Sequence, residues 1–300
     1  LLIKKIKCNT IIKDYLIYVL LATVCDVMPI RKLNRLIAIN ALNNFDIKKN
    51  LPIKKLFELN NKKNKININD LGYLIGPILN AGGRLGKSEY ATEVLSSTND
   101  KIINDKCKDL IKLNEKRKHI EGLILNEINF KKIEDNNKDV IIYYSPNINE
   151  GLIGIIAARL KEFFNKPAIV ITSSNDLLKG SARSVYNYNI GRVIKNLLDE
   201  DIIVSGGGHN MAAGFSLSKE NLKIFNDYIL EDFKKNTNLR DNTFYYDSEI
   251  SSHSLKEEFY ENLKKLEPYG TGNMIPTFLI KDLKVLKSKI LNNSHISLIL

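Results

Sequence analysis

The 300-residue sequence contains no tryptophan, only three cysteines and only four histidines. Cys8, Cys25 and Cys107 are far apart and form no CxxC pair, which argues against a disulfide framework or a zinc site and favours a reducing cytoplasm. The longest apolar run, residues 15–28, is too short to span a membrane and contains Asp26. The sequence therefore indicates a protein without a membrane-spanning helix and without structural disulfides.

Several chemical signatures are also missing. The sequence has no P-loop and no Ser-His-Asp arrangement, and GLIGIIA lacks the spacing of a dinucleotide-binding fingerprint. The N-terminal part has no DxD, and no histidine precedes His119. Asp26 ends a strongly apolar stretch, where a carboxylate caps a turn, forms a pair or binds a metal. On this residue alone the turn and the metal ligand both stay open.

What the sequence does have is positive charge and enough length for two or three domains. The formal net charge of +11 favours an anionic partner, most often nucleic acid, although lysine also serves as solvated surface. The chain starts at Leu1 without methionine and stops on the strand-like HISLIL. We therefore expect it to be a piece of a longer protein.

The first hundred residues are predicted to be helical. Apolar residues recur at helical spacing over residues 15–24 and 31–42, and Ser88 is the expected N-cap of a later helix. Residues 100–130 are predicted to form one long amphipathic helix with Asp100 as its cap. Such a helix could connect two domains.

Strands are expected after residue 135. Predicted strands at 139–145, 167–172 and 177–185 alternate with helical stretches, which indicates an α/β domain up to about residue 235. Two short strands, IIVSGGG (202–208) and AAGFSLS (212–218), are expected around the glycine turn. Beyond residue 240 the pattern is β, with a Pro/Gly-punctuated turn, and looks like the opening of a small β-barrel.

Three glycines stand directly before one of the few histidines, in SGGGHNMAAGF at 205–215. Glycine lets a backbone approach a ligand closely and adopt positive φ, and successive N–H groups in a turn can bind an anion. Gly207, Gly208 and His209 are therefore candidate phosphate or base contacts. A flexible turn with a surface histidine is the alternative, and this motif alone does not decide between them.

Two further segments could contact phosphate. In KGSARS (179–184), Ser181, Arg183 and Ser184 offer two hydroxyls and one planar guanidinium suited to bidentate contact. In NAGGRLG (80–86), two glycines precede Arg84. Taken singly, the first is equally an exposed polar strand and the second a turn between helices.

Seven segments in order carry a resemblance that the single motifs do not. They are ATVCDVMPIRKLNR, GPILNAGGRLG, LNEKRKHIE, NEGLIGIIAARL, KGSARS, GGGHNMAAG and LEPYGTGN. Together they closely resemble the RecJ family of single-strand-specific DNA exonucleases in the DHH phosphoesterase superfamily. The resemblance covers nearly the whole chain.

The resemblance implies a multidomain α/β fold. Residues 1–98 would be the helical C-terminal part of a DHH catalytic domain, and residues 99–133 a connecting helix. Residues 134–237 would be the α/β DHH-associated, nucleic-acid-binding domain, and residues 238–300 the start of an OB-type β-barrel.

It also implies residue roles. Asp26 would be the last of the family's metal-ligand motifs, with the earlier motifs before Leu1, and no other catalytic residue is matched. The expected contacts to DNA are Arg84, Ser181, Arg183, Ser184, Gly207, Gly208 and His209. The chain departs from the family where Ile148 and Asn149 replace Trp-His, Ile78 replaces Arg and Ala182 replaces Gly, so two expected DNA contacts are missing.

The resemblance implies 5′-to-3′ hydrolysis of single-stranded DNA in repair and recombination, through two divalent ions, Mn²⁺ or Mg²⁺. Single-stranded DNA is the expected partner, with a single-strand-binding protein and a helicase as candidate protein partners of a cytoplasmic monomer. One ligand cannot hold two ions, so this piece alone is expected to be inactive. Two alternatives stay open: a DHH-superfamily oligoribonuclease or nucleotide phosphatase, whose C-terminus usually lacks the barrel segment, and a non-catalytic single-strand-binding module.

Overall fold

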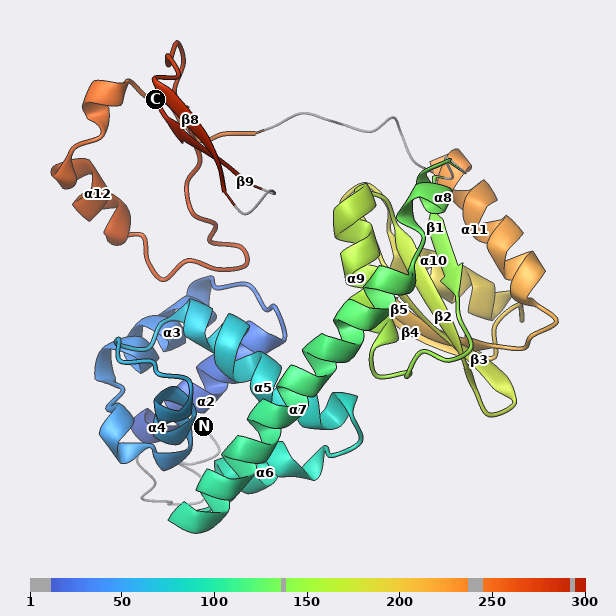
Figure 1. The fold of residues 1–300 in the computed structure, drawn as a ribbon, viewed down its shortest axis with the longest axis horizontal. Helices are drawn as coiled ribbons and strands as arrows, with labels where there is room; N and C mark the ends of the chain where they lie inside the picture. The colour runs from blue at the N-terminus through green and yellow to red at the C-terminus, as the bar shows by residue number, and fades with distance from the viewer. Residues whose placement is uncertain (1–11, 136–138, 237–244, 292–294) are drawn as a thin grey trace. The chain divides into compact units, whose positions relative to one another are not determined.

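The computed structural model describes residues 12–135, 139–236, 245–291 and 295–300 (Figure 1). Cys8 lies outside the described residues. The chain divides into two compact units. The first is Leu1–Asn50, Lys62–Gly76 and Asn242–Leu300, and the second is Leu51–Asn61 and Pro77–Asp241.

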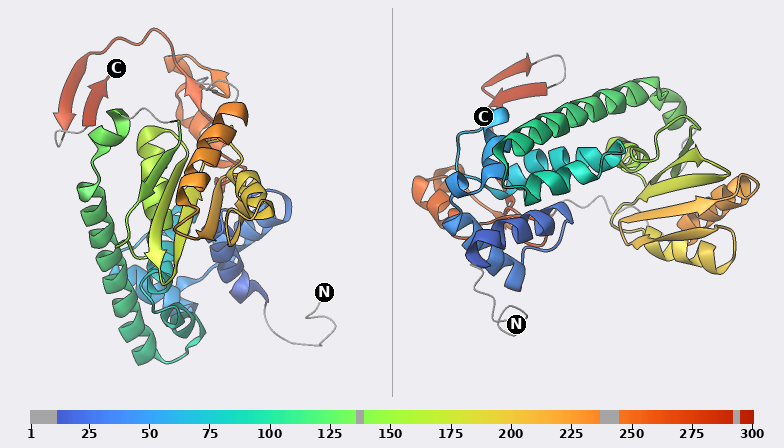
Figure 2. Two further views of the ribbon diagram at one scale, coloured as in Figure 1. Left: turned by 90° about the vertical axis from the view of Figure 1, so that its right-hand side faces the viewer. Right: turned by 90° about the horizontal axis from the view of Figure 1, so that it is seen from below.

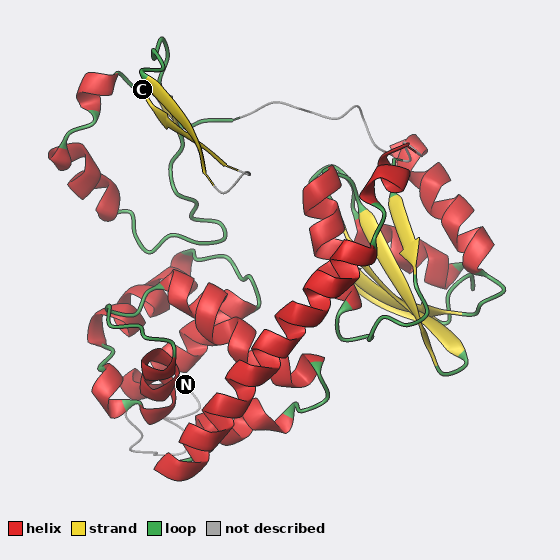
Figure 3. Cartoon of the chain, in the orientation of Figure 1, coloured by secondary structure: helices red, strands yellow, loops and turns green. Residues whose placement is uncertain are grey.

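Helices dominate the early part of the first unit (Figure 3). They are α2 (Ile12–Cys25), α3 (Lys32–Asn44), the single turn η1 (Ile47–Lys49) and the π-helix η2 (Asp70–Ile75). The helices predicted over 15–24 and 31–42 are thus confirmed. Their packed sides include Ile17, Leu20, Ala38 and Ala41, all almost fully buried. No helix in the described ranges has both the length and the apolar character needed to cross a bilayer.

The C-terminal part of the first unit contains short strands and two short helices. They are β6 (Ser248–Glu249), η3 (Ser252–Ser254), α12 (Glu257–Lys264), β7 (Phe278–Leu279), β8 (Lys287–Leu291) and β9 (His295–Ile299). β8 and β9 pair as an antiparallel hairpin, and β6 pairs with β7 in parallel. The guanidinium of Arg35 on α3 donates to the carbonyls of Leu266 (2.7 Å) and Glu267 (3.0 Å), which ties the LEPYGTGN segment to the α2–α3 turn.

The second unit begins with four helices, α4 (Leu51–Leu59), α5 (Gly76–Arg84), α6 (Glu89–Ser96) and α7 (Asp100–Glu127). The long helix predicted over 100–130 is confirmed as α7. Its cap is Asn99, whose side chain accepts from the N–H groups of Lys101 and Ile102, so the predicted cap, Asp100, is wrong by one residue. Ser88 precedes α6 but makes no side-chain capping bond, because its backbone is already helical.

A five-stranded mixed sheet forms the rest of the second unit. Its strands are β1 (Ile141–Tyr144), β2 (Ala168–Ser174), β3 (Leu177–Arg183), β4 (Ser205–His209) and β5 (Ala212–Leu217), in the order β1-β2-β3-β5-β4. β1 and β2 are parallel and the other neighbours are antiparallel. Its helices are α8 (Phe130–Asp135), α9 (Ile153–Phe164), α10 (Ile190–Asp199) and α11 (Leu222–Asn236). The predicted alternation of strands and helices is confirmed.

Helices cover the two faces of this sheet unequally (Figure 2). On one face, α10 and α11 pack over the full width of the sheet, with Ile194, Phe225 and Phe215 in a continuous core. On the other face, α9 lies over β2 and the adjoining part of β3, and Ile156 packs against Val170. The sheet residues of β5 and β4 that point to the α9 side are not part of either core. We call the part of the α9-side face formed by β3, β5 and β4 the open face.

Strands β4 and β5 confirm the two short strands predicted at 202–208 and 212–218, but the glycines do not form the turn between them. Gly206, Gly207 and Gly208 all lie within the strand, and the reversal comes after His209. None of the three has positive φ. The expected concavity of N–H groups in a turn is therefore wrong, and the reason for glycine here has to be close approach.

Helix α7 is fixed to α9 by a buried carboxylate. Glu121 on α7 has a side chain that is only 8% exposed, and it accepts from Arg159 on α9 at 2.8 Å and from Arg117 at 3.4 Å. A carboxylate this buried is stabilised by two cationic partners. The long helix and the sheet domain are thereby joined within the second unit.

Candidate nucleic-acid interface

The strand pairing places polar and small side chains in three rows on the open face. Residues paired directly across antiparallel strands point to the same face, so each row crosses β3, β5 and β4. The rows are Lys179–Ser216–Ser205, Ser181–Gly214–Gly207 and Arg183–Ala212–His209. Arg183 and His209, 26 positions apart in the sequence, thus lie in one row, with backbones roughly 10 Å apart.

Two arginines meet at the edge of the open face next to α9. Arg84, the last residue of α5, donates to the carbonyl of Gly151 at 3.2 Å, in the loop before α9. Arg183 donates to Ser181 Oγ at 3.2 Å and to the carbonyl of Ala182 at 2.8 Å. Burial of Arg183 and the nearby charge of Arg84 both lower the pKa of the Arg183 guanidinium. Arg183 is half-buried and Arg84 is exposed, and because the two cations repel one another, an anion that binds between them is favoured.

No carboxylate neutralises this pair within the described ranges. Salt bridges involve Arg117, Arg159 and Arg192, but neither Arg84 nor Arg183. Both planar guanidinium groups therefore keep donors available for an anion, and Ser181 adds a hydroxyl beside them.

Gly154 makes room for this cluster. It lies in the first turn of α9, and a Cβ there would come within 3.0 Å of Arg183 Nη2 and 3.1 Å of Ser181 Oγ. Because it has no side chain, the helix start can lie directly over β3. The N-terminal turn of α9 therefore faces the arginine pair, and its free N–H groups also favour an anion.

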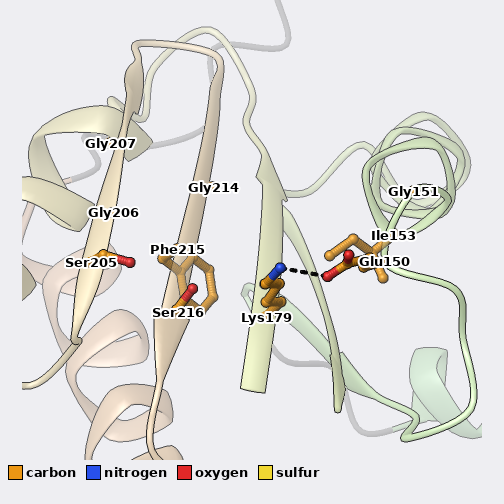
Figure 4. A pocket seen from close by; sticks show the side chains of 11 residues that line it. Glu150, Gly151, Ile153, Lys179, Ser205, Gly206, Gly207, Gly214, Phe215 and Ser216 are labelled. Atoms are coloured by element: carbon orange, nitrogen blue, oxygen red, sulfur yellow. Dashed lines mark ion pairs between the residues drawn. The ribbon is translucent and has the colours of Figure 1, made fainter. Parts of the chain in front are cut away.

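A pocket of about 490 Å³ opens beside the arginine pair on the open face (Figure 4). Its floor is β5 and β4, and one wall is β3 together with the loop that leads into α9. Lining residues from these elements are Glu150, Gly151, Ile153, Lys179, Gly180, Ser205, Gly206, Gly207, Gly214, Phe215 and Ser216. Ser181 pairs with Gly214 of the floor, so the pocket and the arginine pair are adjacent.

The glycines of the floor fall into two classes. A Cβ at Gly208 would overlap the carbonyl oxygen of Ala212, and one at Gly206 would lie 2.9 Å from Ile194, so both glycines are required by the core behind the sheet. A Cβ at Gly207 would meet nothing within 4 Å. At Gly214 it would meet only a carbonyl oxygen at 3.9 Å. Folding does not explain these last two glycines, whereas close approach of a ligand would.

Ser184, one of the seven predicted DNA contacts, does not reach this surface. It follows Arg183 by one residue, and successive side chains of a strand point to opposite faces. Ser184 is 1% exposed and its hydroxyl donates to the carbonyl of Tyr188 at 2.6 Å. We therefore leave Ser184 out of the site proposed below. By the same alternation Gly208 faces the core, and only its backbone is available to a ligand.

Comparison with protein families gives this sheet domain its name. The DHHA1 domain family matches residues 137–235, and the RecJ OB domain family matches residues 246–300. This chain carries the DHHA1 and OB domains of the RecJ family. The resemblance drawn from the seven sequence segments is thereby confirmed, and the open face belongs to the DHHA1 domain.

Curated relatives and solved structures agree with this assignment. The chain is 30% identical to the single-stranded-DNA-specific exonuclease RecJ of Haemophilus influenzae over 303 residues, covering 96% of this chain and 52% of the relative. It is 33% identical to the Escherichia coli RecJ over 217 residues, covering 69% of this chain and 38% of the relative. The chain thus spans about half or less of the length of these relatives.

Two crystal structures of RecJ from Thermus thermophilus share the fold. The one in complex with Mn²⁺ matches with a TM-score of 0.86 at 22% identity, over 100% of this chain and 44% of that one. The one in complex with Mg²⁺ matches with a TM-score of 0.78 at 20% identity, over 99% and 52%. The predicted fold class, a helical part of a DHH domain, a connecting helix, a DHH-associated domain and an OB-type segment, is confirmed.

The departures from the family lie mostly away from the open face of the DHHA1 domain. Ile78 and Ile148 are buried, and Ala182 is buried in the core behind the sheet. Asn149 is used locally, because its side chain accepts from the N–H of Gly151 at 2.8 Å. The Ala182 replacement therefore leaves Ser181 and Arg183 on the open face unchanged.

Four polar side chains of the DHHA1 pocket were not predicted from the sequence: Glu150, Lys179, Ser205 and Ser216. The alternation in LLKGSAR could have placed Lys179 beside Ser181 and Arg183. Glu150 and Ser205 come from other segments, so only the pairing of β3 with β5 and β4 and the position of the α9 loop bring them in.

Asp26 lies in the other unit. It follows the last residue of α2, its N–H donates to the carbonyl of Ala22 at 2.9 Å, and its side chain is exposed. Among the described residues there is no group of three Asp, Glu, His or Cys side chains that could hold a metal ion. Asp26 is available as one ligand, but these residues do not fit a complete metal centre.

Proposed function

We propose that this chain is the strand-end-binding portion of a single-stranded-DNA-specific exonuclease that degrades DNA in the 5′-to-3′ direction and acts in repair and recombination. The observation that carries the proposal is the unneutralised Arg84–Arg183 pair, with Ser181, beside a glycine-floored pocket in a DHHA1 domain. Relatives named single-stranded-DNA-specific exonuclease RecJ support it.

Arg84, Ser181 and Arg183 hold the phosphate at the end of the strand. Two guanidinium groups and one hydroxyl can supply several charge-assisted hydrogen bonds, and the start of α9 adds its dipole. Gly207 lets the DNA strand lie close to the β-sheet. His209, which is exposed at the end of the Arg183 row, contacts the next phosphate or base of the DNA. The contribution to catalysis is positional, since a fixed end sets which phosphodiester reaches the catalytic centre.

The OB segment provides a second surface for single-stranded DNA. Residues 246–300 match the RecJ OB domain, and OB-type surfaces bind single strands through charge and base stacking. The same segment favours the exonuclease over an oligoribonuclease or nucleotide phosphatase of the superfamily, because those proteins usually lack it. The alternative is a non-catalytic single-strand-binding module. Measurements of nuclease activity on the parent protein distinguish it from an exonuclease.

We propose Asp26 as one ligand of a divalent-metal centre, Mn²⁺ or Mg²⁺, whose other ligands lie outside this sequence. Crystal structures of a RecJ have been determined in complex with each of these ions, which supports the choice of metal. Such ions activate water and stabilise the leaving oxygen. Asp26 would be the one carboxylate that this chain supplies to that centre.

The domain boundaries 1–98, 99–133, 134–237 and 238–300 are proposed on the same basis. So are a cytoplasmic location, a monomeric state, and a single-strand-binding protein and a helicase as partners.

Single strands should bind this chain about tenfold more tightly than duplexes of the same length, because a glycine floor and an OB segment accept unpaired bases. Fluorescence anisotropy with a 5′-phosphorylated oligonucleotide and its blunt duplex measures the difference. Both dissociation constants should rise with salt, as phosphate contacts require. Equal affinity for duplex would contradict the proposed function.

The purified 300-residue chain should not digest single-stranded DNA in the presence of Mn²⁺, although it binds the strand. The reason is that a single carboxylate, Asp26, cannot hold two ions. A gel assay of end-labelled oligonucleotide tests this. Robust digestion that Asp26→Asn abolishes would show that the chain contains a complete centre.

A further inference from the structure

The pocket beside the arginine pair is electrically balanced. Among its lining residues only Glu150 and Lys179 are charged, and they pair with one another at 2.6 Å (Figure 4). The arginine pair next to it has no carboxylate partner within the described ranges. One surface thus holds two neighbouring compartments: the arginine pair carries two unbalanced positive charges, and the pocket has no net charge.

The balancing pair has a defined geometry. Glu150 Oε2 accepts from Lys179 Nζ at 2.6 Å and from Ser174 Oγ at 3.1 Å, which links the loop before α9 to β3 and β2. These two donors lower the pKa of the Glu150 carboxyl, so it is ionised at neutral pH. Both bonds end on Oε2, and within the described ranges Oε1 has no hydrogen-bond partner. A carboxylate oxygen at the pocket wall can therefore accept from a ligand.

The floor and size of the pocket suit a flat, uncharged group. Its volume of about 490 Å³ falls within the range of small-ligand sites. Gly207 and Gly214 leave the floor bare, and the hydroxyls of Ser205 and Ser216 stand in the row beside them. A sugar and base can lie on such a floor and find hydrogen-bond partners at its edge.

We propose that this pocket binds the nucleoside of the strand-terminal nucleotide, and that the Glu150–Lys179 pair keeps the pocket neutral so that it selects a nucleoside over a second phosphate. The inference rests on the proposed function, since it takes the neighbouring arginine pair to hold the terminal phosphate. Glu150 and Lys179 are then specificity-determining residues. The anchored phosphate can be attached either to a sugar or to a second phosphate. A pocket without net charge favours the sugar, because a second phosphate would bring negative charge into it.

Competition against a fluorescent single-stranded oligonucleotide on the full 300-residue chain tests the assignment. The probes are thymidine 5′-monophosphate, 2-deoxyribose 5-phosphate and pyrophosphate. Wild-type chain should bind the nucleotide about fivefold more tightly than either other probe, because only the nucleotide fills both compartments. Equal affinity for the nucleotide and 2-deoxyribose 5-phosphate would overturn the nucleoside pocket while leaving the phosphate anchor standing. Failure of all three probes to compete would instead overturn the proposed function.

Charge variants test the role of the pair. Glu150→Gln leaves the positive charge of Lys179 unbalanced, so the preference for thymidine 5′-monophosphate over pyrophosphate should shift about fivefold toward pyrophosphate. Lys179→Gln should shift this preference in the opposite direction. The double variant is neutral again and should return to the wild-type preference, a result that a general loss of folding would not give.

Glu162→Gln is the matched control. Glu162 lies on α9, whereas Glu150 lies in the loop before it. Like Glu150, Glu162 is ion-paired, to Arg159 at 3.3 Å, and its side chain is 56% exposed compared with 51% for Glu150. It does not line the pocket, so the preference should stay at the wild-type value. An unchanged preference in Glu150→Gln, or the same shift in Glu162→Gln, would overturn the role assigned to the Glu150–Lys179 pair.

Discussion

Replacing Arg183 by alanine is expected to weaken binding of a 5′-phosphorylated single strand roughly 30-fold, equivalent to about 2 kcal/mol. The side chain is half-buried and held by Ser181 Oγ and the carbonyl of Ala182, so it is already oriented before an anion arrives. Hydrogen bonds from such a fixed charged donor contribute more than those of a mobile surface lysine. Fluorescence anisotropy at fixed salt measures the loss.

Two further variants separate geometry from charge. Arg183→Lys keeps the charge but loses the planar fork, so it should recover only part of the affinity. Arg192→Gln removes one positive charge from α10, where Arg192 is paired with Asp232 at 2.9 Å. It should change binding less than twofold at physiological salt. Equal losses in Arg183→Ala and Arg192→Gln would mean that net charge, not the arginine pair, holds the DNA.

Gly208→Ala is expected to lower the free energy of unfolding by about 2–3 kcal/mol. The new Cβ would overlap the carbonyl oxygen of Ala212 and lie 2.5 Å from the Cβ of Ala213, on the face covered by α10. The backbone of the β4–β5 pair would have to separate to relieve the overlap. Urea denaturation followed by circular dichroism measures the effect.

Gly207→Ala is the matched control one residue away. Its Cβ would meet nothing within 4 Å, so stability should change by less than about 0.5 kcal/mol, while binding of single-stranded DNA should weaken. This contrast follows from the alternation of the strand, because Gly207 faces the pocket and Gly208 faces the core. Equal destabilisation by both substitutions would contradict the placement of the glycines in β4.

Elements with a strong local pattern could be predicted from the sequence. Helix α10, one of the helical stretches expected between the strands, has four apolar residues on one side, and the structure buries all four: Ile190, Val193, Ile194 and Leu197. The long helix at 100–130 followed equally from its spacing, although its cap moved to Asn99 because either Asn99 or Asp100 can accept the first N–H bonds.

The arrangement of the site could be predicted only in part. Arg84, Ser181 and Arg183 were recognised one by one, but what brings Arg183 into one row with His209 is the strand order β3-β5-β4, which no local pattern encodes. The three glycines are expected at the turn between two short strands, because glycine readily adopts positive φ. Here they form β4, since Gly206 and Gly208 allow Phe215 and Ala213 to pack beneath them.

The proposed function depends most on one claim, that the Arg84–Ser181–Arg183 cluster holds a phosphate at the 5′ end of a single strand. Anisotropy titrations of the 300-residue chain with one oligonucleotide, bearing either a 5′-phosphate or a 5′-hydroxyl, test this claim directly. The wild-type chain should bind the 5′-phosphorylated oligonucleotide about tenfold more tightly than the 5′-hydroxyl one, and the Arg183→Ala variant should lose this preference. Indistinguishable dissociation constants for the two ends in the wild-type chain would contradict it.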